Sequence, residues 1–519
     1  MLHDVRSYRR WAWRIRYDLL FCALVVFGFI WRLVPLLGHG SPVGSDWGND
    51  LIVGHDFLGH TVGDQGLTYP PIMPLAVALL NYVVPLKVVT SVIGAIAGVV
   101  PYAGIYFALR TVGSSLIWAI APLPLLISSS TSELVAFGGA PQAIANGCFP
   151  IVMVAAALLL DHPTRRRALI FGVSVFILAG LSEEVFGQLV ICLIVLLLLE
   201  VMSQPRSALR RVRESLPYFG ISLSPLLLLV PIYVPLVKQL GFNQTVKAAA
   251  IYTPKFNWTF LTREDHLFWN FCLCVAIFVA YYAMVHVRNE MGPLLRASFS
   301  ILLTSIVFIM LVPEIRFSYL LPVGVCFALA LMGYFVLQAI HEIWNRQSYI
   351  FIAVVITLAF TSNVFIQFYF STAMFTQQVI YYGAFSPTAL DMNALQFIQS
   401  HTPSNSLFAV TSVTQADSQI GEWVEGYAER PALLEGNPSL LYYASQKRES
   451  KIATEIFALF PSEQTFRIAN KYDVKFLVIF RTWALYQPMQ TKAFVTAHSS
   501  LVVFSNSDVL ILKVKPYSS

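Results

Sequence analysis

Residues 38–71 read GHGSPVGSDWGNDLIVGHDFLGHTVGDQGLTYPP and follow the first strongly apolar segment of the chain. No lysine or arginine occurs between Leu33 and Leu86. The acidic residues of the stretch are Asp46, Asp50, Asp56 and Asp64. Asp46 and Asp50 are four residues apart, so in a helical turn their carboxylates share one face. We interpret residues 38–70 as an acidic first external loop and this pair as the leading candidate for chemistry.

The composition indicates an integral membrane protein. Of 519 residues, 57% are hydrophobic and 12% charged, whereas soluble chains carry about 25% charged residues. A hydrocarbon core about 30 Å thick needs roughly 20 apolar residues per helix, and the first two thirds of the chain supplies such blocks repeatedly. The basic residues fall in short clusters between these blocks, where they mark topology. We therefore predict a mainly α, polytopic helical bundle in the cell membrane, with no nucleic-acid partner.

The basic clusters also predict the orientation. Several arginines precede the first span at 19–37, which places the N-terminus in the cytoplasm and the acidic loop outside. If every apolar block crossed, the cluster at 165–167 would lie outside. We therefore predict that residues 71–86, a short block with internal prolines, form a juxtamembrane helix that does not cross. About eleven spans then remain in a membrane domain of residues 1–370.

The tail, residues 371–519, has a different pattern. Alternating apolar residues predict strands at 406–412, 474–480, 500–505 and 509–515, with helices at 389–400, 450–460 and 462–471. We expect a small extracytoplasmic α/β domain. Trp423 and Tyr427 lie in an acidic, aromatic loop that would either stack on a sugar or dock the domain on the membrane part.

Asp46 and Asp50 have three possible roles. One of them could act as general base on an acceptor hydroxyl, or the pair could hold a divalent cation, Mg²⁺ or Mn²⁺, against a phosphate leaving group. Alternatively, both cap turns. The sequence indicates no other cofactor. His55, Asp56 and His60 have a looser metal-ligand spacing.

Three further segments carry candidate ligand-binding residues at predicted outer edges of the membrane. Gln142 follows Gly138-Gly139. These glycines would either let a ligand approach the backbone N–H groups closely or simply allow the chain to turn into the next span. Glu183 and Glu184 lie at the end of a predicted span. An ionisable group there costs free energy unless it is hydrated, paired with an opposite charge or part of a functional site.

Arg316 lies outside against the prevailing charge bias, and its guanidinium suits a lipid phosphate. The alternative for Arg316 is an ion pair with Glu314.

The order of these features resembles the prokaryotic GT-C superfamily of polytopic membrane glycosyltransferases, which includes protein mannosyltransferases and aminoarabinose transferases. The similar features are the acidic first loop, Tyr69-Pro-Pro, Gly-Gly-x-Pro-Gln142, Glu314-x-Arg316-Phe and the external tail domain. The resemblance implies a polyprenyl-phosphate sugar as donor, Asp46 with Asp50 beside it as the first-loop acid, and Arg316 on the lipid phosphate. Two departures are Asp-Trp-Gly-Asn-Asp in place of the family's closer acid pair, and no Trp-Trp-Asp motif in the tail.

We therefore predict an inverting glycosyltransferase that acts on the extracytoplasmic face, with a glycan, lipid or protein as acceptor. Asp46 or Asp50 is the expected base. The residues expected to bind substrate are Arg316, Glu314, Tyr69, Gln142, Glu183 and Glu184. Two other hypotheses stay open: a transporter or flippase for a lipid or polar solute, and a non-catalytic polysaccharide-assembly protein.

Overall fold

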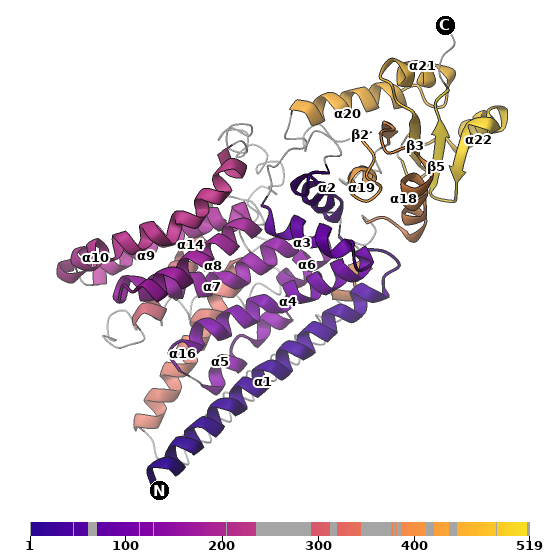
Figure 1. Cartoon of the computed structure of the whole chain (residues 1–519). Coiled ribbons are helices and arrows are strands. Elements are labelled where there is room, and N and C mark those ends of the chain that lie inside the picture. The colour runs from indigo at the N-terminus through magenta and orange to yellow at the C-terminus, as the bar shows by residue number, and fades with distance from the viewer. Residues whose placement is uncertain are drawn as a thin grey trace.

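A computed structural model of the chain describes most of the bundle and of the C-terminal domain. The described residues are 2–44, 46–60, 70–113, 115–127, 129–203, 205–234, 292–311, 319–343, 375–377, 379–380, 386–411, 420–434, 444–483 and 485–515. Figure 1 shows a bundle of long helices with a small α/β unit beyond one end of it. The predicted mainly helical fold class is confirmed.

The bundle is built from helices of very different lengths. Its elements are α1 (Leu2–Gly38), α2 (Trp47–Phe57), α3 (Ile72–Asn81), α4 (Leu86–Arg110), α5 (Leu116–Ile120), η1 (Leu123–Leu126), α6 (Ser129–Phe137), α7 (Ala140–Asp161), α8 (Arg165–Leu181), α9 (Glu183–Ser203), α10 (Pro205–Leu223), η2 (Ser224–Leu229), α14 (Gly292–Leu311) and α16 (Leu321–Ile343). Within the described residues, 5 stretches are long and apolar enough to cross a membrane: Arg16–Gly38, Leu86–Arg110, Ala140–Asp161, Glu183–Met202 and Arg210–Val234. The total of about eleven spans stays a prediction.

The segment predicted as a juxtamembrane helix, residues 71–86, contains the shorter helix α3, and its position along the membrane surface stays a prediction. The 10 residues of α3 make it about 15 Å long, half the thickness of a hydrocarbon core. The apolar segment at 116–126 divides into α5 and η1. Pro122 and Pro124 lie at the break, where each lacks a backbone N–H to continue an α-helix. A further helix, α6, follows.

Glycines bring α4 and α7 into close contact. A Cβ added to Gly104 would lie 1.7 Å from the carbonyl oxygen of Gly147, so only glycine allows this approach, as is common between membrane helices. On another side of α4, the ring of Phe21 in α1 stacks on Tyr106 with centroids 3.9 Å apart. Asp18 of α1 also forms a two-pronged ion pair with Arg110, at 3.0 Å for each contact. These contacts fix the register of α1, α4 and α7.

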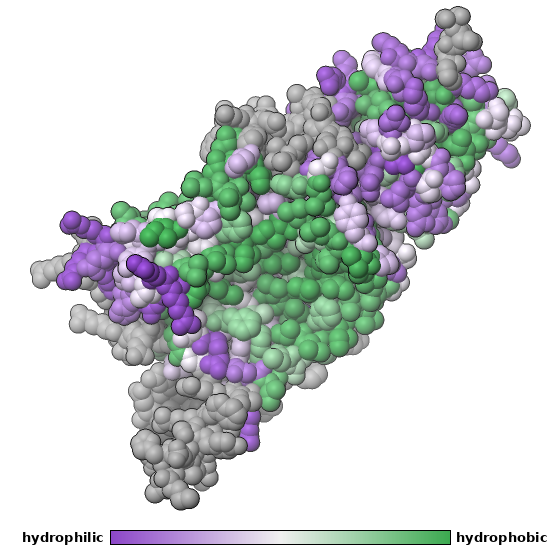
Figure 2. Space-filling view, in the orientation of Figure 1, coloured by the Kyte–Doolittle hydropathy of each residue, from purple (hydrophilic) through white to green (hydrophobic). Residues whose placement is uncertain are grey.

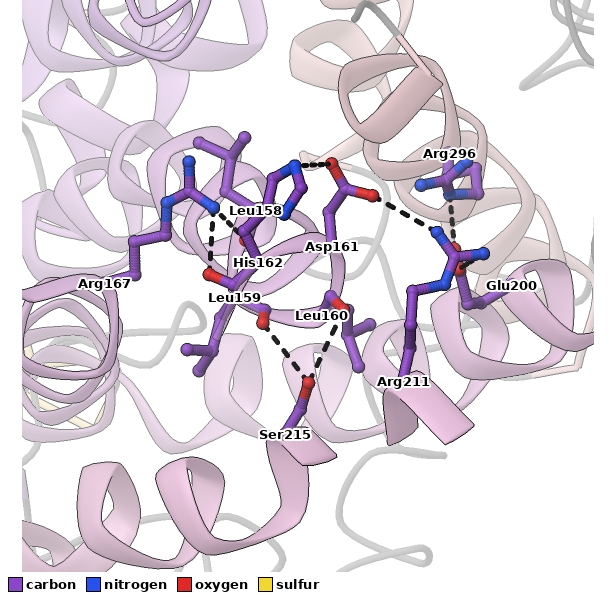
Figure 3. A network of polar contacts seen from close by, with 10 residues as sticks. All are labelled: Leu158, Leu159, Leu160, Asp161, His162, Arg167, Glu200, Arg211, Ser215 and Arg296. Carbon is purple, nitrogen blue, oxygen red and sulfur yellow. Dashed lines mark hydrogen bonds and ion pairs between the residues drawn. The ribbon is translucent and has the colours of Figure 1, made fainter. Parts of the chain in front are cut away.

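A polar network joins α7, α9, α10 and α14 (Figure 3), at the end of the bundle away from α2 (Figure 1). Glu200 of α9 is 1% exposed and forms ion pairs with Arg211 of α10 and Arg296 of α14, each at 2.7 Å. Arg211 also contacts Asp161, the last residue of α7, at 3.2 Å. The predicted basic clusters on α10 and α14 therefore share one end of the bundle, and their buried charges are compensated there.

The C-terminal unit has a 5-stranded sheet in the order β2-β1-β3-β5-β4. Strands β2, β1 and β3 are parallel, and β5 pairs antiparallel with β3 and β4. Its elements are α18 (Ala389–His401), β1 (Phe408–Val410), α19 (Ile420–Gly426), β2 (Ala432–Leu434), α20 (Ala444–Phe457), α21 (Glu463–Lys471), β3 (Phe476–Phe480), α22 (Pro488–Ala497), η3 (Ser499–Leu501), β4 (Val502–Ser505) and β5 (Val509–Lys513). All four predicted strands are present. Sequence analysis missed β2, whose three residues are too few to show an alternating pattern.

The surface separates into an apolar and a polar region. Figure 2 shows a broad hydrophobic face over the bundle and a mostly hydrophilic C-terminal unit. Exposed apolar side chains on the bundle include Val34, Val83, Leu169 and Ile194. An apolar surface of this extent suits lipid rather than water, as expected for a membrane protein.

Replacing Glu200 by alanine should destabilise the bundle by about 3–5 kcal/mol, because two guanidinium groups would lose their buried partner. Unfolding of the full chain in detergent, followed by helical circular dichroism, measures the loss. Glu214→Ala is the matched control, since Glu214 pairs with the exposed Arg210 on the surface of α10 and such pairs contribute little. Equal stability of the two variants would contradict the structural role of Glu200.

Candidate functional site

Two glycines hold the start of the first loop against the junction of α6 and α7. Gly44 and Gly138 both have positive φ, +114° and +109°, a region that favours glycine. A Cβ on Gly44 would lie 2.8 Å from the Cα of Gly138. The N–H of Gly44 also donates to Ser386 Oγ at 2.8 Å, which ties the loop to the chain just before α18. The predicted Gly-Gly segment therefore packs on the acidic loop.

Asp46 occupies the N-cap position of α2, and Gly138 lies directly against it. A Cβ on Gly138 would be 3.2 Å from the Asp46 amide nitrogen. The Asp46 side chain is half-buried, and the positive end of the helix dipole favours its ionised form. Gln142, in the first turn of α7, follows Gly138 by four residues and is buried. The structure thus brings the predicted Asp46 and the predicted Gln142 segment together.

Asp50 lies one turn further along α2 in a very different environment. It is 1% exposed, and its Oδ2 has no hydrogen-bond partner in the described part of the chain. Burial, and then the charge of Asp46, raise the pKa of Asp50 well above its usual value. Two carboxyls whose environments separate their pKa values commonly divide the acid and base roles. Asp46 is accordingly the more accessible carboxyl, and Asp50 is the one whose burial favours the neutral form.

Helix α19 of the C-terminal unit crosses α2 at glycines. A Cβ on Gly48 would be 2.8 Å from the Trp423 ring, and a Cβ on Gly426 would be 2.3 Å from the Gly48 carbonyl oxygen. Trp423 is fully buried. Of the two roles left open for Trp423, docking of the domain is therefore the one that the structure supports, because a buried ring offers no face to a sugar.

The α2–α19 contact gathers further acids. Burial, and then the charges of Asp46 and Asp50, raise the pKa of Glu422 to about 8. Burial also raises the pKa of Glu425 well above its usual value, although Glu425 accepts a hydrogen bond from the Ala432 N–H at 3.1 Å. Sequence analysis missed Glu422 as a site residue. The acidic, aromatic composition of residues 421–431 was the available indication, but nothing in it pointed to α2.

Of the other predicted site residues, Glu183 and Glu184 are placed only at the same end of the bundle as α2, and the rest lie outside the described residues. Glu183 and Glu184 begin α9 at the end of the bundle that carries α2, since Gly180 at the end of α8 packs on Ile72 of α3. Tyr69, Glu314 and Arg316 lie outside the described residues, so their roles stay predictions.

No metal centre is preformed in the described ranges. They contain no group of three or more His, Cys, Asp or Glu residues that could hold a metal ion. His55 is buried, and burial lowers its pKa, with the charge of Glu429 opposing this effect. Asp46 and Asp50 offer two oxygen ligands to a hard cation such as Mg²⁺, which also takes ligands from a substrate phosphate. The divalent cation stays a prediction.

Comparison with solved structures gives the fold. The structure matches ArnT from Cupriavidus metallidurans bound to undecaprenyl phosphate with a TM-score of 0.55 at 13% sequence identity, over 96% of this chain and 98% of that one. The apo state of the same protein matches with a TM-score of 0.53 at 15% identity, over 97% and 98% of the two chains. No protein-family profile matches the sequence, and no curated protein matches it. The chain therefore has the fold of ArnT along nearly its whole length.

The raised pKa of Glu422 predicts that the folding stability contributed at the α2–α19 contact depends on pH. The pKa of Glu422 rises from 4.5 to about 8 on folding, so between these values the folded chain holds a proton that the unfolded chain has lost. The stabilisation is complete below the lower value and is lost as the pH rises to the upper one. We expect the apparent melting temperature of the full chain in detergent to fall across this window.

Glu422→Gln should reduce this fall, because a neutral amide holds no titrating proton. Glu463→Gln is the control: its side chain is 83% exposed, and the variant should follow the wild type. An unchanged pH dependence in Glu422→Gln would show that Glu422 is ionised in the folded chain.

Proposed function

We propose that the chain is a membrane glycosyltransferase that moves a sugar from a polyprenyl-phosphate carrier to an acceptor on the side of the bundle where α2 lies. The observation that carries the proposal is the accessible Asp46 beside the buried Asp50, on a chain with the fold of ArnT. One ArnT structure contains undecaprenyl phosphate, which supports the same class of carrier here. The sugar acceptor is a glycan, a lipid or a protein.

Asp46 acts as the general base in this proposal. Its carboxylate takes the proton of an acceptor hydroxyl, and the freed oxygen attacks the anomeric carbon of the sugar. The bond between that carbon and the phosphate oxygen breaks, and polyprenyl phosphate leaves with the bonding electrons. A single displacement inverts the anomeric centre. Phosphate is a good leaving group, so the protein mainly positions the reactants and balances charge.

Asp50 and Glu422 support Asp46 as neutral neighbours. An anionic phosphate close to several ionised carboxylates would be repelled. Burial raises the pKa of both carboxyls, that of Glu422 to about 8, and so favours their neutral forms. The predicted substrate residues Arg316, Glu314, Tyr69, Gln142, Glu183 and Glu184 would hold the donor. A divalent cation, Mg²⁺ or Mn²⁺, bound to the phosphate oxygens would supply further positive charge to the leaving phosphate.

The two aspartates should respond differently to amidation. Asp46→Asn removes the base and should lower the transfer rate by about 10²–10⁴-fold. Asp50→Asn resembles a protonated carboxyl in shape and charge, so it should keep most of the activity. Transfer is measured with a radiolabelled polyprenyl-phosphate sugar and purified full chain in lipid nanodiscs, with release of polyprenyl phosphate as a second readout.

Full activity of Asp46→Asn would remove this residue from the mechanism. In sealed vesicles, movement of the labelled lipid across the membrane without cleavage of the sugar–phosphate bond would identify a transporter instead.

A further inference from the structure

Arg32 of α1 places a guanidinium inside the bundle. Its residue is 0% exposed, whereas Ile30 and Val34 on the opposite face of the helix are more than half exposed. Arg32 therefore points inward and does not extend along the lipid face to reach water, as arginines near helix ends usually do. It lies six residues before the end of α1, about 9 Å along the helix axis.

This guanidinium has no acidic partner in the described part of the chain. Its three nitrogens, Nε, Nη1 and Nη2, make no hydrogen bond to any residue that the structure describes. The ring of Trp31, 4.8 Å from the guanidinium carbon, supplies a weak cation–π contact. An unpaired charge within a membrane bundle is costly, and such groups generally mark a ligand or ion site. Arg211 and Arg296 differ, because Glu200 compensates both.

The facing helix is shaped to accept Arg32. A Cβ on Gly98 of α4 would lie 2.0 Å from Arg32 Cδ and 2.3 Å from its Nε. No other residue type leaves room for the side chain at this position. The inward conformation of Arg32 therefore depends on glycine in α4.

A second polar group without a partner lies at the same level. Leu36 of α1 and Val135 of α6 both pack at Gly94 of α4, within 3.3 Å of its Cβ position. One turn deeper on the three helices are Arg32, Gly98 and Ser132. Ser132 is buried, and its Oγ has no hydrogen-bond partner among the described residues.

A third such group comes from α7. Gly147 packs on Val100 of α4, two residues past Gly98, so its neighbour Asn146 lies within about one helical turn of the same level. The side-chain amide of Asn146 is buried, and neither its oxygen nor its nitrogen has a partner in the described ranges. Among the described residues, a cation and a hydroxyl therefore lack hydrogen-bond partners at one level, and an amide lacks them within about one turn of that level. Buried polar groups are normally satisfied.

This level lies directly below the acids. Gly138 contacts Asp46, and Ser132 precedes Gly138 by six residues along α6, about 9 Å. A guanidinium binds two phosphate oxygens at once, and hydroxyl and amide groups complete such a site. We propose that Arg32, Ser132 and Asn146 form an anion site inside the bundle that binds the phosphate of a polyprenyl-phosphate carrier, with the sugar directed toward Asp46.

This assignment rests on the proposed function and gives the carrier phosphate a place within the described residues. Arg316, predicted to bind the same phosphate, lies outside them. The site does not involve the acids of the α2–α19 contact, so it can be tested without sugar transfer.

The test compares thermal unfolding of full-length wild type and Arg32→Gln in lipid nanodiscs, with and without undecaprenyl phosphate. Removing an uncompensated buried charge should raise the melting temperature of the lipid-free protein by a few degrees. The same change should abolish the stabilisation by undecaprenyl phosphate and weaken its binding at least about tenfold. Ser132→Ala should weaken binding several-fold and leave folding intact. Arg165→Gln, at an exposed position, should match the wild type in both respects.

Two probes test the chemistry of the ligand. Undecaprenol, which lacks the phosphate, should not stabilise the wild type, and inorganic phosphate should compete with undecaprenyl phosphate. Equal stabilisation by undecaprenol would overturn the proposal. A lower melting temperature of Arg32→Gln with unchanged lipid affinity would overturn it too, because Arg32 would then be structural.

Asp46→Asn separates this inference from the proposed reaction. The variant should bind undecaprenyl phosphate as tightly as the wild type while losing transfer. If it kept transfer while Arg32→Gln lost lipid binding, the mechanism would fail and the anion site would stand.

Discussion

The close backbone contacts of four glycines hold the candidate site together. Gly44 meets Gly138 at the entrance to α2, and Gly48 meets Gly426 where α19 crosses that helix. A side chain at any of these four positions would clash with the neighbouring element, which would have to move away. The short helix α2 is therefore fixed from two sides, by the membrane bundle and by the C-terminal unit. The position of Asp46 and Asp50 depends on both.

This arrangement gives two similar carboxyl groups different properties. Asp46 is at the start of α2, partly accessible and next to the positive end of a helix dipole. Asp50, one turn later, is buried. Helix α19 of the C-terminal unit packs on α2 and adds Glu422 to the same group of acids.

The two ends of the bundle differ in how their buried charged residues are paired. Far from α2, Glu200 and Asp161 balance two arginines within an ion-pair network. Toward α2, the first-loop acids gather on one side of the membrane edge, and Arg32 is buried below them. A phosphate bound between these two regions would be attracted by Arg32 on one side. On the other side, the raised pKa values of Asp50 and Glu422 would reduce the repulsion from the acids. The charge pattern therefore fits an anionic carrier whose reactive end faces the acids.

The sequence by itself determined the membrane-embedded helical bundle, the acidic loop after the first span, the short helix α3 and four of the five strands. Each follows from apolar periodicity, proline positions or charge bias within one segment. Only the tertiary structure decided that Asp50 is the buried aspartate, that Glu422 lies near both aspartates, and that no acid among the described residues pairs with Arg32. Burial and charge pairing depend on residues hundreds of positions apart, such as Gly48 and Gly426. No local pattern carries that information, because a helix such as α19 has the same composition whether or not another helix covers it.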